Sequence, residues 1–340
     1  MGRPVAAAER PTRAGVGTAT VEAPAPVRPT AGGTTELGRS DRAQPLHGIL
    51  PALVTPFRRG EVDREACRRL IDHVVAGGVD GVLVLGSSGE GAALTPRMRR
   101  IVVDAVAGAL GGRRPFVVGV ITSSVAAAIE DVRHAARAGA CAALVAPPHY
   151  GSVDNEGALS FYRTLAARVQ LPILAYNIPA FTHVTIRPEV VEILGREGTI
   201  AGIKDSSRDF DYFQEVVARL RDVSAFCALT GTDSLLVPAQ LSGAHGGITV
   251  GANLVPEWCV NAWSAATEGR WPDARRWQER LVRLGVAIRR GTFPAGMKAA
   301  LALRGVCSSE LAVPGRALGS DEQAQLKAQL VDLGVLPGTG

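Results

Sequence analysis

Lysine is scarce in this chain of 340 residues, although basic residues are common. Of the 37 lysines and arginines, only three are lysines: Lys204, Lys298 and Lys327. Such a bias towards arginine is typical of a GC-rich coding sequence, and by itself it excludes no function. It does make each retained lysine a position to examine, because arginine serves as the basic residue elsewhere.

Paired cysteines and clustered histidines are also missing. The five cysteines include no Cys-x-x-Cys pair, and the six histidines show neither His-x-His nor His-Glu-x-x-His spacing. An odd number of cysteines argues against a disulfide framework, and the missing spacings argue against a structural zinc site. We therefore expect a reducing compartment, which we take to be the cytoplasm, and no metal.

Neither a membrane segment nor a nucleic-acid-binding surface is indicated. No apolar run approaches the roughly 18 residues that a transmembrane helix needs, so we expect a soluble protein without a membrane partner. The net charge of +5 comes from arginines that are mixed with 32 acidic residues along the chain. Because no basic arm or stripe stands out, we expect no nucleic-acid partner.

Residues 1–45 differ in composition from the rest of the chain. They are rich in Pro, Ala, Gly, Thr and Arg, and they show neither a helical period nor a strand period. This composition predicts a disordered N-terminal extension. A transit peptide is the alternative, but Glu9, Glu22 and the many prolines disfavour the amphipathic helix that it needs.

From Leu46 onward, short apolar runs alternate with longer segments of helical period. The predicted strands are 49–57, 81–85, 115–120, 142–146, 172–176, 200–204, 225–229 and 247–250. The predicted helices between them are 64–76, 96–110, 125–138, 156–169, 188–194, 210–220 and 235–242. Nearly continuous apolar strands that alternate with helices indicate parallel strands covered on both faces.

Eight such units predict a (β/α)8 TIM barrel over residues 46–270. Four helical segments follow the eighth strand, at 257–267, 272–289, 295–304 and 321–333. One of them completes the barrel, and the others form a helical layer at 271–340. A doubly wound α/β fold is the alternative, but its G-x-G-x-x-G fingerprint after a first strand is missing.

Polar residues follow several predicted strands, at the end of the barrel where chemistry takes place in this fold. Lys204 is the strongest catalytic candidate, because it ends the sixth strand. Burial disfavours the ammonium form of lysine, and a neutral amine can attack a ketone to form an imine. The alternative is a lysine that reaches solvent or pairs with Asp205 or Asp233.

Two neighbouring strand ends supply groups that complement such a lysine. Tyr176, at the end of the fifth strand, is suited to carry the protons that an imine mechanism moves, although a merely buried aromatic residue also fits. Gly86, Ser87 and Ser88 follow the second strand and offer hydroxyl and backbone N–H groups to a small carboxylate. The alternative is a tight turn without a binding role, which would need the same glycines.

The chain resembles the superfamily of N-acetylneuraminate lyase and dihydrodipicolinate synthase, which are class I aldolases that bind pyruvate. The resemblance covers residues 46–318. It rests on three motifs: G-S-S-G-E after the second strand, Y-N-I-P at the end of the fifth strand and G-I-K-D on the sixth strand.

The resemblance implies a role for each matching residue. Lys204 would form a Schiff base with pyruvate, and Tyr176 would shuttle protons. Ser87 would hydrogen-bond the Tyr176 hydroxyl and, with the backbone of Ser88, hold the pyruvyl carboxylate. Tyr150 would reach into the proton relay of a neighbouring subunit, which implies a homotetramer built as a dimer of dimers. No cofactor is implied.

Departures from the family pattern bear on the second substrate. Synthases of the lysine pathway carry an arginine where this chain has Phe181, and phenylalanine cannot clamp a carboxylate. Sialic acid lyases carry a glutamate and a serine where this chain has Ser234 and Val250. A long polyhydroxylated tail would therefore lose partners, and Asp233 and Thr249 remain as candidate contacts for one or two hydroxyls.

The sequence thus predicts a pyruvate-dependent lyase that cleaves or forms a 4-hydroxy-2-oxo acid, such as a 2-keto-3-deoxy sugar acid, with a small aldehyde or 2-oxo acid as partner. A 4-hydroxy-tetrahydrodipicolinate synthase and a keto-deoxy sugar acid dehydratase are alternatives on the same scaffold. Two further alternatives are a non-catalytic sensor of pyruvate or a sugar acid and a phosphate-binding barrel enzyme. The latter would use the glycine-rich stretch 243–251 to bind phosphate. Lys298 is expected to lie on a helix surface.

Overall fold

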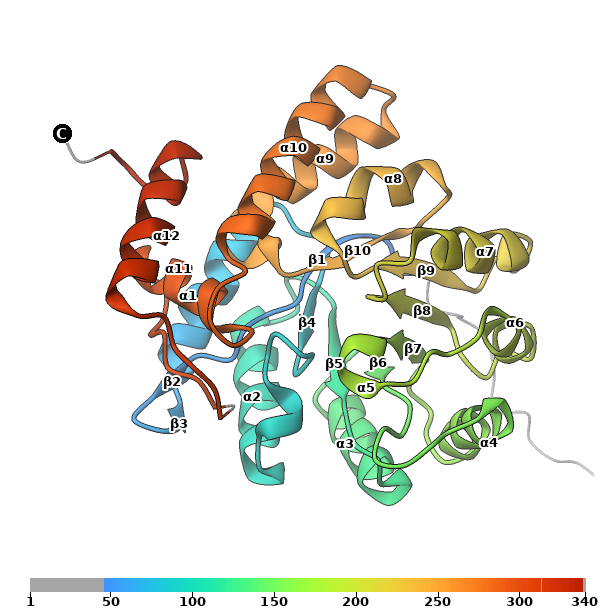
Figure 1. The fold of residues 1–340 in the computed structure, drawn as a ribbon. Helices are drawn as coiled ribbons and strands as arrows, with labels where there is room; N and C mark the ends of the chain where they lie inside the picture. The colour runs from blue at the N-terminus through green and yellow to red at the C-terminus, as the bar shows by residue number, and fades with distance from the viewer. Residues whose placement is uncertain (1–45, 313, 339–340) are drawn as a thin grey trace, which may run out of the picture. The chain divides into compact units, whose positions relative to one another are not determined.

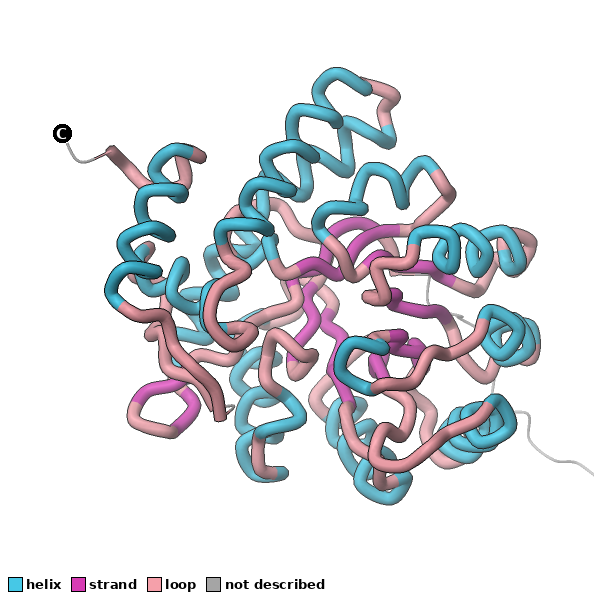
Figure 2. The backbone as a smooth tube through the Cα atoms, in the orientation of Figure 1, coloured by secondary structure: helices cyan, strands magenta, loops and turns pink. Residues whose placement is uncertain are grey.

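The computed structural model describes residues 46–312 and 314–338, which belong to one compact unit. The predicted disorder of residues 1–45 falls outside this part of the chain. Eight parallel strands form a barrel at the centre of the unit, with helices around it, as Figures 1 and 2 show. The predicted (β/α)8 TIM barrel is therefore confirmed.

The barrel strands follow one another around the sheet in chain order. They are β1 (Gly48–Pro51), β4 (Val82–Val84), β5 (Phe116–Val120), β6 (Ala142–Val145), β7 (Ile173–Asn177), β8 (Gly202–Asp205), β9 (Cys227–Thr230) and β10 (Gly246–Thr249). β10 pairs with β1, and a parallel bridge between Ala52 and Leu83 joins β1 to β4. Side chains such as Leu144, Leu174 and Ile248 fill the interior, so the barrel is a packed core.

Helices alternate with the strands and cover the outside of the barrel. They are α1 (Arg64–Ala76), α2 (Pro96–Leu110), α3 (Val125–Arg137), α4 (Asn155–Ala166), α6 (Pro188–Arg196), α7 (Phe210–Leu220), α8 (Leu236–Leu241) and α9 (Pro256–Thr267). Several begin where the sequence supplies a capping side chain. Asp63, Ser124 and Asp209, for example, each accept a hydrogen bond from a backbone N–H in the first turn.

Three further helices follow the barrel: α10 (Trp271–Ala287), α11 (Ala295–Leu303) and α12 (Ser320–Asp332). They share one hydrophobic cluster with α1, α2 and α9. The described residues on both sides of residue 270 belong to one compact unit, and a domain boundary at that residue stays a prediction.

Short elements were not predicted, and one predicted strand is too long. The short elements are β2 (Phe57–Arg58), β3 (Glu61–Val62), α5 (Pro179–Thr182), η1 (Gly91–Ala93), η2 (Asp233–Leu235) and η3 (Gly251–Asn253). The first strand was predicted to run to Phe57, but it ends at Pro51. Ala52 and Leu53 still contact the neighbouring strands; beyond them the backbone leaves the sheet, and the Val54 N–H donates to the side chain of Asn253 at 3.0 Å. The residues that follow the strand are buried although they do not belong to it. Their apolar side chains therefore made the predicted strand too long.

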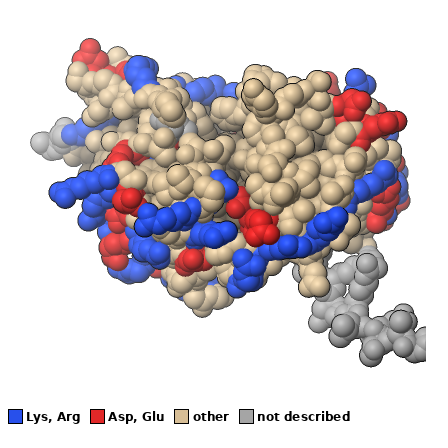
Figure 3. Space-filling model, turned by 90° about the horizontal axis from the view of Figure 1, so that it is seen from below, with Lys and Arg blue, Asp and Glu red and all other residues tan. Residues whose placement is uncertain are grey.

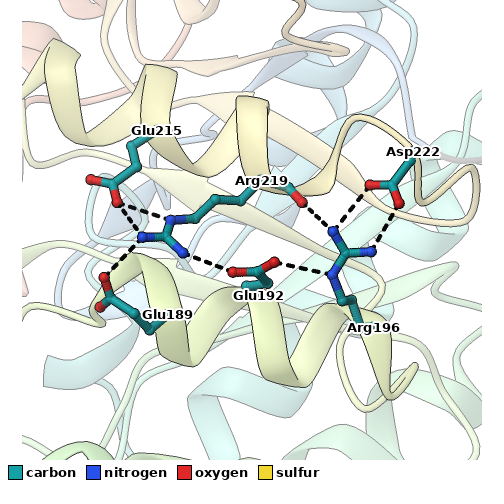
Figure 4. A network of polar contacts seen from close by, with 6 residues as sticks. All are labelled: Glu189, Glu192, Arg196, Glu215, Arg219 and Asp222. Carbon is teal, nitrogen blue, oxygen red and sulfur yellow. Dashed lines mark hydrogen bonds and ion pairs between the residues drawn. The ribbon is translucent and has the colours of Figure 1, made fainter.

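Arginines on the outer helices are engaged in ion pairs rather than gathered into one patch. Figure 4 shows Arg219 of α7 bridging Glu189 and Glu192 of α6 and Glu215 of its own helix. Arg196 of α6 continues the network to Glu192 and Asp222. On the face drawn in Figure 3, basic and acidic side chains are likewise interspersed.

Candidate active site

Lys204 and Tyr176 lie side by side at the C-terminal ends of two paired strands. The register of β7 and β8 pairs Tyr176 with Lys204, and both residues are buried. The Lys204 Nζ lies 3.5 Å from the Tyr176 hydroxyl and 4.6 Å from the centre of its ring. Among the described residues, no ion pair joins Lys204 to a carboxylate. The alternative in which Lys204 pairs with Asp205 or Asp233 is therefore wrong.

Gly231, which follows β9, makes room for the lysine side chain. A Cβ atom at this position would lie 2.8 Å from the Lys204 Cε and 2.0 Å from the Ser206 Oγ. Neither approach is sterically possible, so a larger residue here would displace the lysine. Because Gly231 has no side chain, the Lys204 side chain has room beside it.

Ser87 completes a row of three polar groups. Its Oγ lies 3.2 Å from the Tyr176 hydroxyl, so Ser87, Tyr176 and Lys204 form a chain of hydrogen-bonding contacts from β4 through β7 to β8. Ser87 is half-buried, whereas Ser88 and Gly86 beside it are buried. The structure therefore brings together the hydroxyl, the phenol and the amine that the sequence singled out separately.

The loop that carries Ser87 is held in a strained conformation. Leu85 and Glu90, at its two ends, have φ angles of 58° and 56°, in the left-handed region that residues other than glycine seldom adopt. The Thr55 hydroxyl donates to the Gly89 carbonyl at 2.6 Å and fixes the middle of the loop. Strain of this kind persists only where surrounding contacts determine the backbone, and it is common at functional sites.

A buried ion pair fastens the same loop to the C-terminal helices. The Lys298 Nζ of α11 lies 2.6 Å from the Glu90 Oε1, and both side chains are completely buried. Glu90 also accepts the backbone N–H of Ala312, and the Lys298 ammonium lies 4.3 Å from the centre of the Phe57 ring. Burial lowers the pKa of Lys298, while Glu90 opposes that shift.

The expectation that Lys298 lies on a helix surface is therefore wrong. Helix α11 is almost entirely buried, and Lys298 is its only charged residue. A charge on such a helix has to find a buried partner. The apolar residues on every side of Lys298 were the signal for this in the sequence.

Asn177 and Asp205 form a second paired set that the sequence analysis did not assign. They are the residues after Tyr176 and Lys204, and the Asn177 side-chain amide donates to the Asp205 Oδ1 at 2.7 Å. The Ser207 hydroxyl donates to the other carboxylate oxygen at 2.9 Å. Burial raises the pKa of Asp205, whereas these hydrogen bonds lower it. The pair locks the two strand ends in register, and its place in the Y-N-I-P and G-I-K-D motifs could have revealed it.

Tyr150 stands apart from this group. It is 93% exposed, and the Ser123 Oγ holds its backbone by accepting the N–H groups of His149 and Tyr150 at 3.0 and 2.9 Å. Ser123 follows β5 and was not considered in the sequence analysis. Within one chain, Tyr150 does not meet Ser87, Tyr176 or Lys204.

Phe181 lies on α5, directly after β7, and its ring is 54% exposed. It packs against Phe293, which lies between α10 and α11 and is 43% exposed. The two ring centres are 6.1 Å apart, with an angle of 38° between the rings. Phe293 was not identified from the sequence.

The remaining candidates are engaged elsewhere. The Asp233 Oδ1 accepts the backbone N–H of Gly251 at 2.9 Å, and burial raises the pKa of this carboxyl. The Thr249 hydroxyl is fully buried, 3.8 Å from the Cys259 Sγ of α9. Val250 packs half-buried against the cluster that α9 and α10 share. None of these three is brought into contact with Lys204.

The glycine-rich stretch 243–251 is taken up by packing. Its Gly246 meets the β1 backbone so closely that a Cβ atom would lie 2.1 Å from the Gly48 carbonyl oxygen, and the Gly251 N–H is occupied by a carboxylate. A phosphate cradle would need such N–H groups free, which disfavours the phosphate-binding alternative.

In residues 46–312 and 314–338, no group of three or more His, Cys, Asp or Glu side chains could hold a metal ion. No helix in that same part of the chain is long and apolar enough to cross a membrane.

Comparison with known proteins agrees with the fold and with the motifs. Residues 45–333 match the dihydrodipicolinate synthetase family. A 4-hydroxy-tetrahydrodipicolinate synthase of Phenylobacterium zucineum is 40% identical over 291 residues, which cover 86% of this chain and 98% of that protein. A Halobacterium salinarum protein named as an uncharacterised DapA-like lyase is 37% identical over 292 residues, covering 86% of this chain and 95% of the relative.

Among solved structures, a prophage protein of the dihydrodipicolinic acid synthase family from E. coli K12, in complex with pyruvate, superimposes with a TM-score of 0.82. It is 28% identical, and the match covers 85% of this chain and 99% of that protein. Family model, relatives and fold agree across the barrel and the helices that follow it. The chain belongs to the dihydrodipicolinate synthetase family, and it is an enzyme of the class I aldolase and lyase type.

Proposed function

We propose that this enzyme is a pyruvate-dependent lyase that uses Lys204 to form a Schiff base and reversibly cleaves a 4-hydroxy-2-oxo acid to pyruvate and an aldehyde. The observation that carries the proposal is the buried amine of Lys204, which lies 3.5 Å from the Tyr176 hydroxyl and has no ion-pair partner among the described residues. The E. coli relative that binds pyruvate supports the choice of the oxo acid.

The cleavage begins at the oxo carbon of the substrate. The Lys204 amine attacks C2, water leaves, and an iminium ion joins the Nζ to the substrate. The 4-hydroxyl then loses its proton, the C3–C4 bond breaks, and the aldehyde departs. The electron pair of that bond moves into the iminium and gives an enamine. Protonation at C3 and hydrolysis release pyruvate and restore the amine.

Tyr176 moves the protons in this sequence. Its hydroxyl lies between the Lys204 Nζ and the Ser87 Oγ, so it can give a proton to the departing hydroxyl of the carbinolamine and take one from the 4-hydroxyl. Ser87 orients the phenol. The Ser87 hydroxyl and the adjacent backbone of Ser88 bind the substrate carboxylate, which fixes C2 near the amine.

The proposal includes an assembly and a compartment. Tyr150 is almost fully exposed in a single chain, so its role in the proton relay requires a second copy of the protein, in a homotetramer built as a dimer of dimers. All five cysteines are free and four are buried, which suits the reducing cytoplasm.

A second candidate is 4-hydroxy-tetrahydrodipicolinate synthesis. It is favoured by the relative from Phenylobacterium zucineum, which carries that name and is 40% identical. It is disfavoured by Phe181, which offers no guanidinium to a second carboxylate. Both reactions begin with the same imine on Lys204, so they differ only in the partner of pyruvate.

The test is a turnover assay that separates the two reactions. The purified enzyme is incubated with a set of 4-hydroxy-2-oxo acids, including 2-keto-3-deoxygluconate, and with pyruvate plus aspartate semialdehyde. Products are read by mass spectrometry. We expect pyruvate and an aldehyde from at least one hydroxy-oxo acid, and no turnover by Lys204→Ala. Loss of water without aldehyde release, or turnover of aspartate semialdehyde alone, would contradict the lyase assignment.

A further inference from the structure

Exposed aromatic side chains gather at one end of the barrel. Of the four aromatic residues exposed in the described chain, Tyr150 and Phe181 follow barrel strands, Phe293 packs on Phe181, and only Trp271 lies elsewhere, at the start of α10. Large apolar groups are normally withdrawn from water, so an exposed pair in mutual contact at the catalytic end of a barrel indicates a surface that contacts a ligand.

The position of Phe181 is fixed by the strand that carries Tyr176. The Ile178 carbonyl, two residues beyond Tyr176, accepts the backbone N–H groups of Phe181 and Thr182 at 3.0 and 3.1 Å. The Thr182 hydroxyl donates to the same carbonyl. The Phe181 ring therefore sits on a rigid turn that starts at the end of the catalytic strand.

The position of Phe293 is fixed from the other side of the site. The backbone N–H of neighbouring Thr292 donates to the Arg316 carbonyl at 3.0 Å, and five residues beyond Phe293 the ammonium of Lys298 pairs with Glu90. The segment from Phe293 to Lys298 thus contacts both the turn that follows β7, through Phe181, and the loop of Ser87, through Glu90. The Tyr176 hydroxyl of β7 and the Ser87 hydroxyl of that loop lie 3.2 Å apart.

We propose that Phe181 and Phe293 form the contact surface for the distal end of the aldehyde. The preferred aldehyde is apolar: an aldehyde with an aryl group is preferred over one with a hydroxylated or carboxylated chain. The inference rests on the proposed function and narrows its substrate class. Aromatic rings bind other rings in tilted or offset geometry, and their electron-rich faces repel a carboxylate. A polar tail would find no charged partner at these two positions after β9. Ser234 is exposed but uncharged, and the Asp233 carboxyl already accepts the Gly251 N–H.

The inference is tested by competition between acceptors in the direction of synthesis. Pyruvate is supplied with benzaldehyde, glyceraldehyde or succinic semialdehyde, and kcat/KM is measured for each aldehyde. We expect benzaldehyde to be preferred in the wild type. Phe293→Ala and Phe181→Ala should each lower the ratio of benzaldehyde to glyceraldehyde kcat/KM by about tenfold or more, as loss of apolar contact does. Trp271→Ala, which removes an exposed aromatic ring elsewhere, should leave the ratio as it is.

The inference would be overturned if the wild type preferred glyceraldehyde or succinic semialdehyde. It would also be overturned if the Phe variants lost kcat/KM equally with all three aldehydes. Phe293→Leu provides a variant of nearly conserved volume, in which the ratio should fall in the same direction but less. Trapping of pyruvate on the enzyme by borohydride is run in parallel. If pyruvate is trapped on Lys204 but benzaldehyde is not preferred, only this inference fails; if pyruvate is not trapped, the proposed function fails.

Discussion

Two buried lysines, Lys204 and Lys298, have opposite surroundings. Lys298 is neutralised by Glu90 at 2.6 Å, whereas Lys204 has a phenol and a serine hydroxyl nearby and, within the described chain, no ion pair. The buried position of Lys204 beside these hydroxyl groups is the geometry on which its proposed role as a nucleophile rests. Arginine could take neither place, because its guanidinium stays charged and is too large for a site shaped around an amine.

Replacing Lys298 should destabilise the fold. Lys298→Met leaves the Glu90 carboxylate buried without its cation, and we expect the free energy of unfolding to fall by about 3–5 kcal/mol, as measured by urea denaturation. The matched control is Lys327→Met on α12, where the lysine is exposed; its effect should stay within about 0.5 kcal/mol. Equal effects of the two substitutions would show that the buried pair is not needed.

Ser87 should act on the reaction through Tyr176. Ser87→Ala removes the partner of the phenol, and we expect kcat to fall roughly fivefold, the effect of one hydrogen bond of about 1 kcal/mol, with a changed pH profile. Ser87→Thr keeps the hydroxyl and should keep both kcat and the pH profile close to those of the wild type. If Ser87→Thr is as impaired as Ser87→Ala, packing rather than the hydroxyl group matters at this position.

At the scale of elements, the sequence allowed the barrel to be predicted because each strand is a short apolar run between segments of helical period. The proposed catalytic residues Tyr176 and Lys204 could be placed side by side because the ends of barrel strands converge. What could not be predicted depends on contacts between distant segments. The Glu90–Lys298 and Phe181–Phe293 contacts join loops of the barrel to the C-terminal helices, and no local pattern reports such pairings.

The ion-pair network between α6 and α7 should make stability depend on pH and salt. Hydrogen bonds from Arg219 and Arg196 lower the pKa of Glu192 from 4.5, and Arg196 lowers that of Asp222 from 3.8. Carboxyls with lowered pKa values stabilise the fold above their unfolded pKa values, and this contribution is lost as the pH falls through the lowered values. It is therefore fully present at pH 7 and is lost progressively as the pH falls below the ordinary values of 4.5 and 3.8.

The network is tested with Arg219→Ala, by urea denaturation at pH 7 and pH 3.5 and at low and high salt. We expect a loss of stability at pH 7 and low salt that shrinks towards pH 3.5, as the carboxyls take up protons, and in high salt, where the charges are screened. Arg275→Ala, which breaks a single exposed pair with Glu279, should have a smaller effect under every condition. A loss for Arg219→Ala that is independent of pH and salt would contradict the electrostatic account.

At the scale of the whole molecule, the proposed role of the exposed Tyr150 makes activity depend on assembly. If Tyr150 completes the proton relay of a neighbouring subunit, activity per chain should fall when the enzyme is diluted until it dissociates, as followed by sedimentation. Tyr150→Phe should lower kcat in the intact oligomer without changing its mass. Full activity in a monomer, or a variant as active as the wild type, would remove Tyr150 from the mechanism.

The central claim is that Lys204 forms an imine with pyruvate, and trapping tests it most directly. The enzyme is incubated with pyruvate, reduced with borohydride, digested and analysed by mass spectrometry. We predict a stable pyruvyl-derived adduct on the peptide that contains Lys204, and none in Lys204→Arg, whose circular dichroism should show an intact fold. Absence of an adduct in the wild type, or an adduct that persists in the folded Lys204→Arg variant, would contradict the account.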